Sequence, residues 1–268
     1  MDVALCTLDN LLYDVATFEN LGMAAVSYYR RHLVCPDCHG QAFYRRRASD
    51  GQSACFGARP HLASCPWWAR NIASSERVLL GGEFIPADES IEIDFDYGGW
   101  HLPLDNLTAP AHPWSLPTLQ ARPATTRRRL STLLSNLMYN PAFAQSTQRI
   151  AVGDDHLRVC DLFARFDTTT LAMGGEYHGF WGLVSDANHG GNEPPSLWLN
   201  SGGRQDLSIV IDAEQQGDFC QRWPFFDFEA LAGACVLVFG TLRVSSLGKK
   251  YVAVNDIDAL SINLLGHT

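Results

Sequence analysis

The spacing of apolar and polar residues predicts short strands and one long helix in the first sixty residues. Residues 2–8 have the pattern of a strand, and residues 14–33 predict a helix with Asp14 as its N-cap. Two more short strands are expected at residues 41–47 and 53–58, joined by a polar turn. Such a hairpin would bring together the segments that flank it.

The middle of the chain holds one strand pattern and one helix pattern. Residues 91–96 alternate between apolar and acidic side chains and predict a strand with an acidic face. In residues 125–140 the apolar side chains recur every three or four positions, which predicts a helix. The arginines at 127–129 would then lie at its start, where positive charge opposes the helix dipole. We expect either a phosphate backbone or the acidic residues 88–96 to hold them.

From about residue 174 the pattern predicts mainly strands, with room for one helix near 226–231. A loop is expected at 188–195 and a hairpin turn at 201–204. The five expected strands are residues 177–185, 196–201, 206–212, 234–245 and 251–260. Five strands with a helix between the third and fourth is the order of a small Greek-key barrel.

Composition describes a globular chain with ample core. The 268 residues are 46% hydrophobic and 18% charged, which suits two domains and excludes a disordered chain. No run of about 18 apolar residues predicts a membrane span, and the acidic N-terminus does not resemble a signal peptide. Eight cysteines, three of them in metal spacing, fit a reducing cytoplasm. Arginine far outnumbers the two lysines, which hints at a bacterial source.

Charge is unevenly distributed. The net charge is −9, which argues against a protein that coats nucleic acid indiscriminately. Residues 126–173 carry six arginines against four acidic residues, whereas residues 174–268 carry five basic residues against eleven acidic ones. Positive charge is therefore concentrated before the last predicted strands.

Four residues have the spacing of a closed metal site. Cys35 and Cys38 form Cys-x2-Cys, and His61 and Cys65 form His-x3-Cys. Three thiolates and one imidazole make a complete tetrahedral set for a structural Zn²⁺, with no position left for a catalytic water. A metal would explain how a segment poor in apolar periodicity folds.

Two alternatives to this ligand set stay open. Cys55 stands inside the predicted hairpin and is the second choice in place of His61, with His39 a weaker substitute. The other interpretation is that these three cysteines and one histidine are ordinary buried residues, since free cysteine is often buried. The turn-forming neighbours of Cys38 and Cys65 favour the metal site.

No catalytic motif is present. The sequence lacks a phosphate-binding loop, a nucleophile elbow, an HExxH motif and a glycine-rich dinucleotide motif. Asp94 and Asp96 form a carboxylate pair, but the solvated face of a strand explains them better. We therefore expect a protein that is not an enzyme.

The last 95 residues resemble nucleic-acid-binding domains of the OB-fold class. The resemblance lies in the stretch Val236–Leu260, in which a strand with Gly240 at its bend is followed by a turn with two lysines and a final strand. It implies binding of single-stranded nucleic acid across the second and third strands. Its candidate contacts are Trp198, Trp181 or Tyr177, Arg204, Arg243, Lys249, Lys250 and Tyr251.

Residues 1–65 resemble the zinc-containing N-terminal region of CoiA-type competence proteins. A strand, a helix, a Cys-Pro-x-Cys motif, an arginine-bearing strand and a phenylalanine-containing strand before a histidine occur in the same order. No nuclease domain follows, so the resemblance implies no activity.

The sequence as a whole predicts an α+β, mostly β protein. A zinc-bound α/β module at 1–80 is followed by an acidic, proline-rich connector at 81–173 and a five-stranded OB-fold barrel at 174–268. We expect a bacterial accessory protein that binds single-stranded DNA or RNA, or, alternatively, an acidic protein-docking subunit of a DNA-processing complex. Its candidate phosphate contacts are Arg45, Arg46, Arg47, Arg59, Arg127, Arg128 and Arg129.

Overall fold

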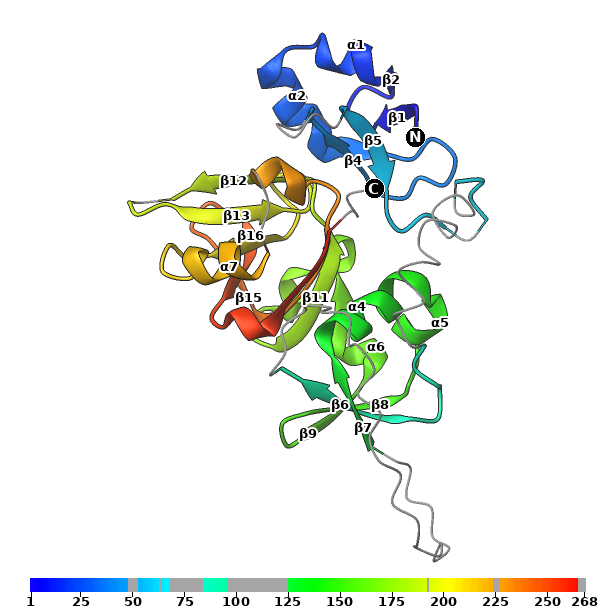
Figure 1. The fold of residues 1–268 in the computed structure, drawn as a ribbon, viewed down its shortest axis with the longest axis vertical. Helices are drawn as coiled ribbons and strands as arrows, with labels where there is room; N and C mark the ends of the chain where they lie inside the picture. The colour runs from blue at the N-terminus through cyan, green and yellow to red at the C-terminus, as the bar shows by residue number, and fades with distance from the viewer. Residues whose placement is uncertain are drawn as a thin grey trace, which may run out of the picture.

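A computed structural model shows that the protein has a mixed α+β fold that is mostly β (Figure 1). The structure describes residues 1–47, 53–62, 64–67, 84–95, 125–191, 193–223 and 227–264. Its strands form four separate sheets, and among the described strands no sheet closes into a barrel. The predicted fold class is confirmed at this level. None of the described helices is long and apolar enough to cross a membrane.

The N-terminal module, residues 1–67 as far as they are described, contains two small sheets. A three-stranded sheet has the order β2-β1-β3, and an antiparallel hairpin joins β4 to β5. The strands are β1 (Val3–Cys6), β2 (Leu12–Asp14), β3 (Leu33–Val34), β4 (Ala42–Arg45) and β5 (Cys55–Ala58). The strands predicted at 2–8, 41–47 and 53–58 are confirmed.

The single helix predicted at 14–33 is wrong in length. Three short helices take its place: α1 (Val15–Glu19), α2 (Met23–Tyr29) and the 3-10 helix η1 (Arg30–His32). Asp14 caps α1 as predicted, because its carboxylate accepts the Thr17 N–H at 2.8 Å. Gly22, the N-cap of α2, has a φ of 84°, which is outside the helical region and keeps α1 and α2 separate.

The core of this module is small and aromatic. Phe18, Tyr44 and Phe56 are buried, and their ring centroids lie 5.0–5.5 Å apart. Cys35 and Cys65 are buried in the same cluster. Two of the four predicted metal ligands therefore belong to the core of the module.

The middle sheet comprises four strands in the order β7-β6-β8-β9, with β6 parallel to both neighbours. They are β6 (Ser90–Asp94), β7 (Thr125–Arg129), β8 (Arg149–Val152) and β9 (Asp155–Arg158). The strand predicted at 91–96 is confirmed as far as Asp94, and Asp96 lies outside the described residues.

The helix predicted at 125–140 begins later than expected. Residues 125–129 form β7, and α4 spans Leu130–Tyr139. The arginines at 127–129 thus lie on a strand instead of at a helix start. Shorter elements follow: α5 (Pro141–Ala144), α6 (Val159–Leu162), β10 (Phe163–Arg165), η2 (Phe166–Thr168) and η3 (Leu171–Met173).

The C-terminal sheet has eight strands. They follow the order β10-β11-β15-β16-β14-β13-β12, and β17 pairs with β15. Its strands after β10 are β11 (Tyr177–Leu183), β12 (Asp186–Gly190), β13 (Ser196–Asn200), β14 (Ser208–Ile211), β15 (Cys235–Val244), β16 (Lys250–Val254) and β17 (Leu260–Asn263). The five predicted strands are all present.

Two details of the C-terminal prediction are corrected. Residues 188–190 of the expected loop belong to β12. Their backbone N–H and C=O groups are satisfied by pairing with β13. The predicted helix near 226–231 is only the 3-10 helix η4 (Phe228–Leu231), while α7 lies earlier at Gln216–Arg222. A further 3-10 helix, η5 (Ile257–Ala259), precedes β17.

Strands β11 and β15 are buried on both faces. Phe180 and Val238 point into the core between the C-terminal strands. Trp181, Leu237 and neighbouring residues point into a second core, which they share with α4 and the middle sheet. The middle sheet and the C-terminal strands are thus joined by apolar contact, which fixes their relative positions. The domain boundaries at 80 and 173 remain predictions.

Candidate metal centre and nucleic-acid interface

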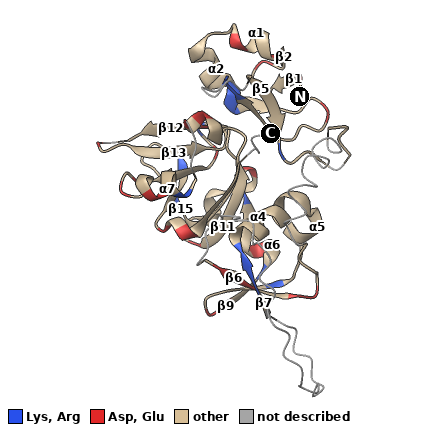
Figure 2. Cartoon of the chain, in the orientation of Figure 1, with Lys and Arg blue, Asp and Glu red and all other residues tan. Residues whose placement is uncertain are grey.

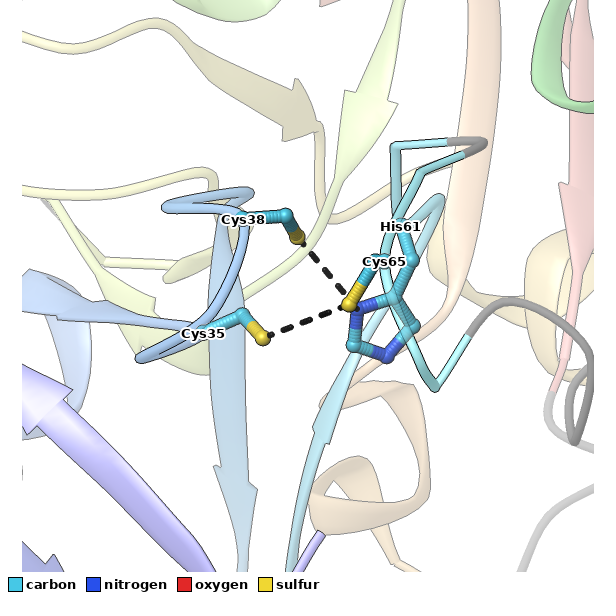
Figure 3. A group of neighbouring side chains, drawn as sticks. All are labelled: Cys35, Cys38, His61 and Cys65. Atoms are coloured by element: carbon cyan, nitrogen blue, oxygen red, sulfur yellow. Dashed lines mark hydrogen bonds between the residues drawn. The ribbon is translucent and has the colours of Figure 1, made fainter.

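The four residues of the predicted metal site converge in space (Figure 3). Their ligand atoms all lie within 4.8 Å of one another. The Sγ atoms of Cys35 and Cys65 are 4.0 Å apart, and the Nδ1 atom of His61 is 3.5 Å from Cys38 Sγ and 3.4 Å from Cys65 Sγ. Three sulfurs and one imidazole nitrogen therefore surround a common point, as a tetrahedral ion requires.

Local backbone structure presents the ligands. The turn after β3 is closed by two hydrogen bonds, from Cys35 N–H to the Gly40 carbonyl at 2.8 Å and from His39 N–H to the Cys35 carbonyl at 2.9 Å. This brings Cys38 back toward Cys35. The second ligand pair follows β5, whose pairing with β4 carries residues 61–65 toward the turn. As predicted, the β4–β5 hairpin brings the two ligand pairs together.

The pKa values of the candidate ligands shift in different directions, and burial raises the pKa of the Cys65 thiol to about 11. Burial acts to raise the pKa of the Cys38 thiol, but N–H groups of Leu62 and Gly40 oppose it and leave that pKa below its ordinary value. Burial also lowers the pKa of His61, so its ring is neutral at pH 7 and Nδ1 can act as a ligand. Three sulfurs and one nitrogen form a donor set that can hold a metal ion.

The two substitute ligands lie outside the group. Cys55 is in β5 opposite Arg45. His39 is exposed in the turn and has a φ of 54°. Among the described residues, only Cys35, Cys38, His61 and Cys65 form such a cluster of potential ligands.

An aromatic pair lies on the outer face of the C-terminal sheet. Leu197 and Leu199 belong to the core, so Trp198 between them points the other way and is half-buried. Tyr251 precedes the core residue Val252 on β16 and is also half-buried. The Trp198 and Tyr251 ring centroids are 5.9 Å apart.

The other aromatic candidates divide into one buried and one exposed residue. Trp181 is 5% exposed and packs in the second core. Tyr177 is 48% exposed near the start of β11. Sequence analysis could not assign these orientations, because they depend on which core each strand face meets.

The cations predicted near this face have different surroundings. Arg243 is exposed and lies directly opposite Tyr251 in the strand pairing. Arg204 donates to the Leu247 carbonyl at 3.1 Å, and Lys250 donates to the Thr169 carbonyl at 2.6 Å. Lys249 donates to the Gly203 carbonyl at 2.9 Å, and burial lowers its pKa to about 8.

The hairpin arginines are partly used inside the protein. The Arg59 Nη2 group donates to the Tyr139 hydroxyl at 2.8 Å and to Asn263 at 3.1 Å, so this side chain joins β17 and α4 to the module. Arg46 donates to the Ser27 hydroxyl at 3.0 Å. Arg45 is half-buried and Arg47 is exposed. Arg59 is therefore a structural residue, and only Arg47 is fully available at the surface.

The arginines of β7 meet the acidic neighbours that the sequence offered as one of two partners. Arg128 is buried and donates to both carboxylate oxygens of Glu89, at 2.8 and 2.7 Å. Arg127 donates to Glu92 at 3.0 Å. Arg129 lies opposite Asp94 in the strand pairing. The acidic-face alternative is confirmed for Arg127 and Arg128.

Sequence analysis missed the ion pairs that join the module to the C-terminal strands. Arg30 is buried and donates to both oxygens of Glu229, at 3.0 and 2.6 Å. Arg31 donates to both oxygens of Asp186, at 2.6 and 2.8 Å. The basic run at 30–32 was the only signal, and it fitted the end of a helix equally well.

Figure 2 shows basic and acidic residues in each of the described parts of the chain. This agrees with the observed pairing of most of the arginines considered above.

No known protein-family model and no curated protein matches this chain. One similar solved structure is the Stn1-Ten1 complex of S. pombe, with 14% sequence identity and a TM-score of 0.22. The match covers 33% of this chain and 57% of that chain, so it spans little more than half of the neighbour's length. Likeness at this level carries no argument about fold or function.

Proposed function

We propose that this protein is a non-catalytic binder of single-stranded nucleic acid, with an OB fold at its C-terminus and a structural zinc site in its N-terminal module. The observation that carries the proposal is the Trp198–Tyr251 pair on an outer sheet face. Adjacent aromatic rings on such a face provide a surface on which successive bases stack.

The strand order supports an OB fold. Only Val184 and Ser185 separate β11 from β12, so the two act as halves of one bent first strand. With that reading, the first strand pairs with β13 and β15, β14 runs parallel to β16, and α7 lies between β14 and β15. These are the pairings of a five-stranded Greek-key barrel. Gly240 allows β15 to bend, because a Cβ there would lie 2.7 Å from Val252 Cγ1.

The donor set supports zinc as the metal. Three cysteines and one histidine make up one of the common ligand sets of structural zinc. All four positions are filled by protein, which suits a site that stabilises a fold.

Charge around the aromatic pair supports a modest electrostatic contribution. Arg243 lies beside Tyr251, and Lys249 and Arg204 lie in the adjacent loops. Since residues 174–268 have a net negative charge, stacking rather than phosphate contact is expected to supply most of the affinity.

The test is binding of fluorescent single-stranded and duplex oligonucleotides over a salt series. We expect Trp198→Ala and Tyr251→Ala each to weaken single-strand binding by about 5- to 150-fold, since stacking is worth about 1–3 kcal/mol per base. Tyr28→Ala is the matched control, because Tyr28 is an exposed tyrosine on the module. Equal binding by all three variants would refute the proposed interface.

The second candidate function is a protein-docking subunit. The acidic charge of residues 174–268 favours it, because OB folds also bind proteins. Absence of oligonucleotide binding at low salt by a correctly folded, metal-loaded sample would move the assignment to this function.

A further inference from the structure

A cavity of about 260 Å³ lies where three parts of the chain meet. The N-terminal module contributes Arg31, His32 and His39, the end of β10 contributes Arg165, and the turn between β13 and β14 contributes Gly202 and Asp206. Its volume is near the lower end of small-molecule sites, about 300–1,000 Å³. None of its residues belongs to the metal cluster or to the aromatic pair.

Two arginines in the cavity wall are held in place by carboxylates. The Nε and Nη2 groups of Arg31 donate to Asp186, and the same two groups of Arg165 donate to Asp167. In the part of the chain that the structure describes, the Nη1 group of each guanidinium has no hydrogen-bond partner. A carboxylate therefore fixes one edge of each guanidinium and leaves a second edge for a ligand.

Two histidines add further donors. Burial lowers the pKa of His32, with the neighbouring Arg31 acting in the same direction and Asp206 against it. His32 is therefore neutral at pH 7 and offers one N–H. It packs closely on the turn, since a Cβ on Gly203 would lie 2.8 Å from its Cε1 atom.

His39 is in an unusual backbone conformation. Its φ of 54° lies in the left-handed region, which costs a residue with a Cβ about 1–2 kcal/mol relative to glycine. The turn that presents Cys38 needs this φ, and glycine would supply it without strain. A histidine that lines the cavity in spite of this cost indicates a use for its imidazole.

The acidic residues nearby already have partners. Asp167 and Asp186 accept from the two arginines, and Asp206 accepts the Gly203 N–H at 2.7 Å. Formal charges in the wall thus nearly cancel. Attraction for an anion would come from converging N–H donors rather than from net charge, as it does at backbone anion sites.

We propose that this cavity binds a phosphate group through Arg31, Arg165, His32 and His39. Guanidinium edges and imidazole N–H groups match the oxygens of a phosphate, and the volume admits a small phosphate ester. The phosphate belongs either to the end of a nucleic-acid strand or to a free phosphorylated molecule. The site does not depend on the proposed stacking interface.

The test uses the full-length, metal-loaded protein titrated with inorganic phosphate at constant ionic strength, with calorimetry and thermal denaturation as readouts. We expect saturable binding and a rise in the unfolding temperature. Arg165→Gln should weaken phosphate binding at least about tenfold, because one charge-assisted contact is lost. The control is Arg158→Gln, which breaks a comparable exposed pair with Asp161 away from the cavity.

His39→Gly separates loss of the ligand contact from loss of folding. Glycine relieves the backbone strain, so this variant should keep its metal content and its stability while phosphate binding weakens. Absence of saturable binding to the parent protein, or equal binding by Arg165→Gln and Arg158→Gln, would overturn the proposal.

Oligonucleotides with and without a 5′-phosphate distinguish the two sources. If the phosphate belongs to a strand end, the phosphorylated oligonucleotide binds more tightly and Arg165→Gln removes the difference. If it belongs to a free molecule, both oligonucleotides bind equally while inorganic phosphate still saturates the cavity. Trp198→Ala leaves the binding of inorganic phosphate unchanged in either case, which separates this site from the stacking interface.

Discussion

The N-terminal module and the C-terminal sheet achieve their stability by different means. No strand of the module exceeds four residues, and its core comprises twelve buried residues, two of which are metal-site cysteines. The C-terminal sheet contains a ten-residue strand, and one of its two cores has twenty buried residues and no metal ligand. Short strands with a small core need another source of free energy, and the metal ion proposed for the Cys/His cluster is the candidate for it.

The largest expected effect is therefore loss of the metal. Cys35→Ser removes a buried sulfur ligand, and we expect the module to lose its fixed structure while the C-terminal strands keep theirs. Structural zinc contributes on the order of 10 kcal/mol to small domains. Metal content by mass spectrometry and limited proteolysis would measure the two parts of this outcome.

Cys55→Ser is the matched control, because Cys55 lies in β5 outside the ligand group. It should keep one metal ion per chain and an intact module. Metal loss in this variant and not in His61→Ala would show that Cys55, and not His61, is the fourth ligand.

The sequence could predict the features that depend on residues close to one another along the chain. The metal ligands and the Asp14 cap depend on residues that are close in sequence, so their spacing was sufficient. Five C-terminal strands could be predicted because each carries its own apolar pattern. The pairing of β11 with β15 and the parallel pairing of β14 with β16 join strands that are not consecutive, so local patterns do not predict them.

Features that depend on distant residues could not be predicted. Arg128 was expected at a helix start with either a phosphate backbone or the acidic residues 88–96 as its partner, and only the parallel pairing of β6 with β7 decides for Glu89. Arg30 finds Glu229 across 199 positions of sequence. No local pattern distinguishes such a buried pair from an exposed basic run.

The second prediction concerns the Arg30–Glu229 pair, which joins the two regions. Arg30→Met leaves a carboxylate only 20% exposed without its partner, which should cost about 3–5 kcal/mol of unfolding free energy. Chemical denaturation would measure it. This variant differs from metal loss in one respect: the module should stay folded in Arg30→Met, whereas it should lose its fixed structure without the metal.

A double variant, Arg30→Met with Glu229→Met, tests the cause. Removing both charges should recover part of the lost stability, since no unpaired charge is then buried. If the double variant is less stable than Arg30→Met alone, the pair holds the two regions by its hydrogen bonds to Tyr44 and Arg46 instead.

The smallest predicted effect lies in the middle sheet, which contains none of the candidate metal ligands. The two hydrogen bonds from Arg128 hold the pKa of Glu89 below its ordinary value, although burial acts against them. A lowered pKa means that the carboxylate stabilises the fold above about pH 4.5, and that this stability is lost as the pH falls further. Glu89→Gln should therefore cost about 2 kcal/mol at pH 7, and progressively less as the pH falls below about 4.5. Thermal denaturation between pH 7 and pH 3 would measure the difference.

Glu92→Gln is the control variant, because it alters the exposed pair between Glu92 and Arg127. It should change the free energy of unfolding by less than about 0.5 kcal/mol over the same pH range. Equal effects of the two variants would mean that burial of the Arg128 pair does not contribute, and that apolar packing alone holds β6 against β7.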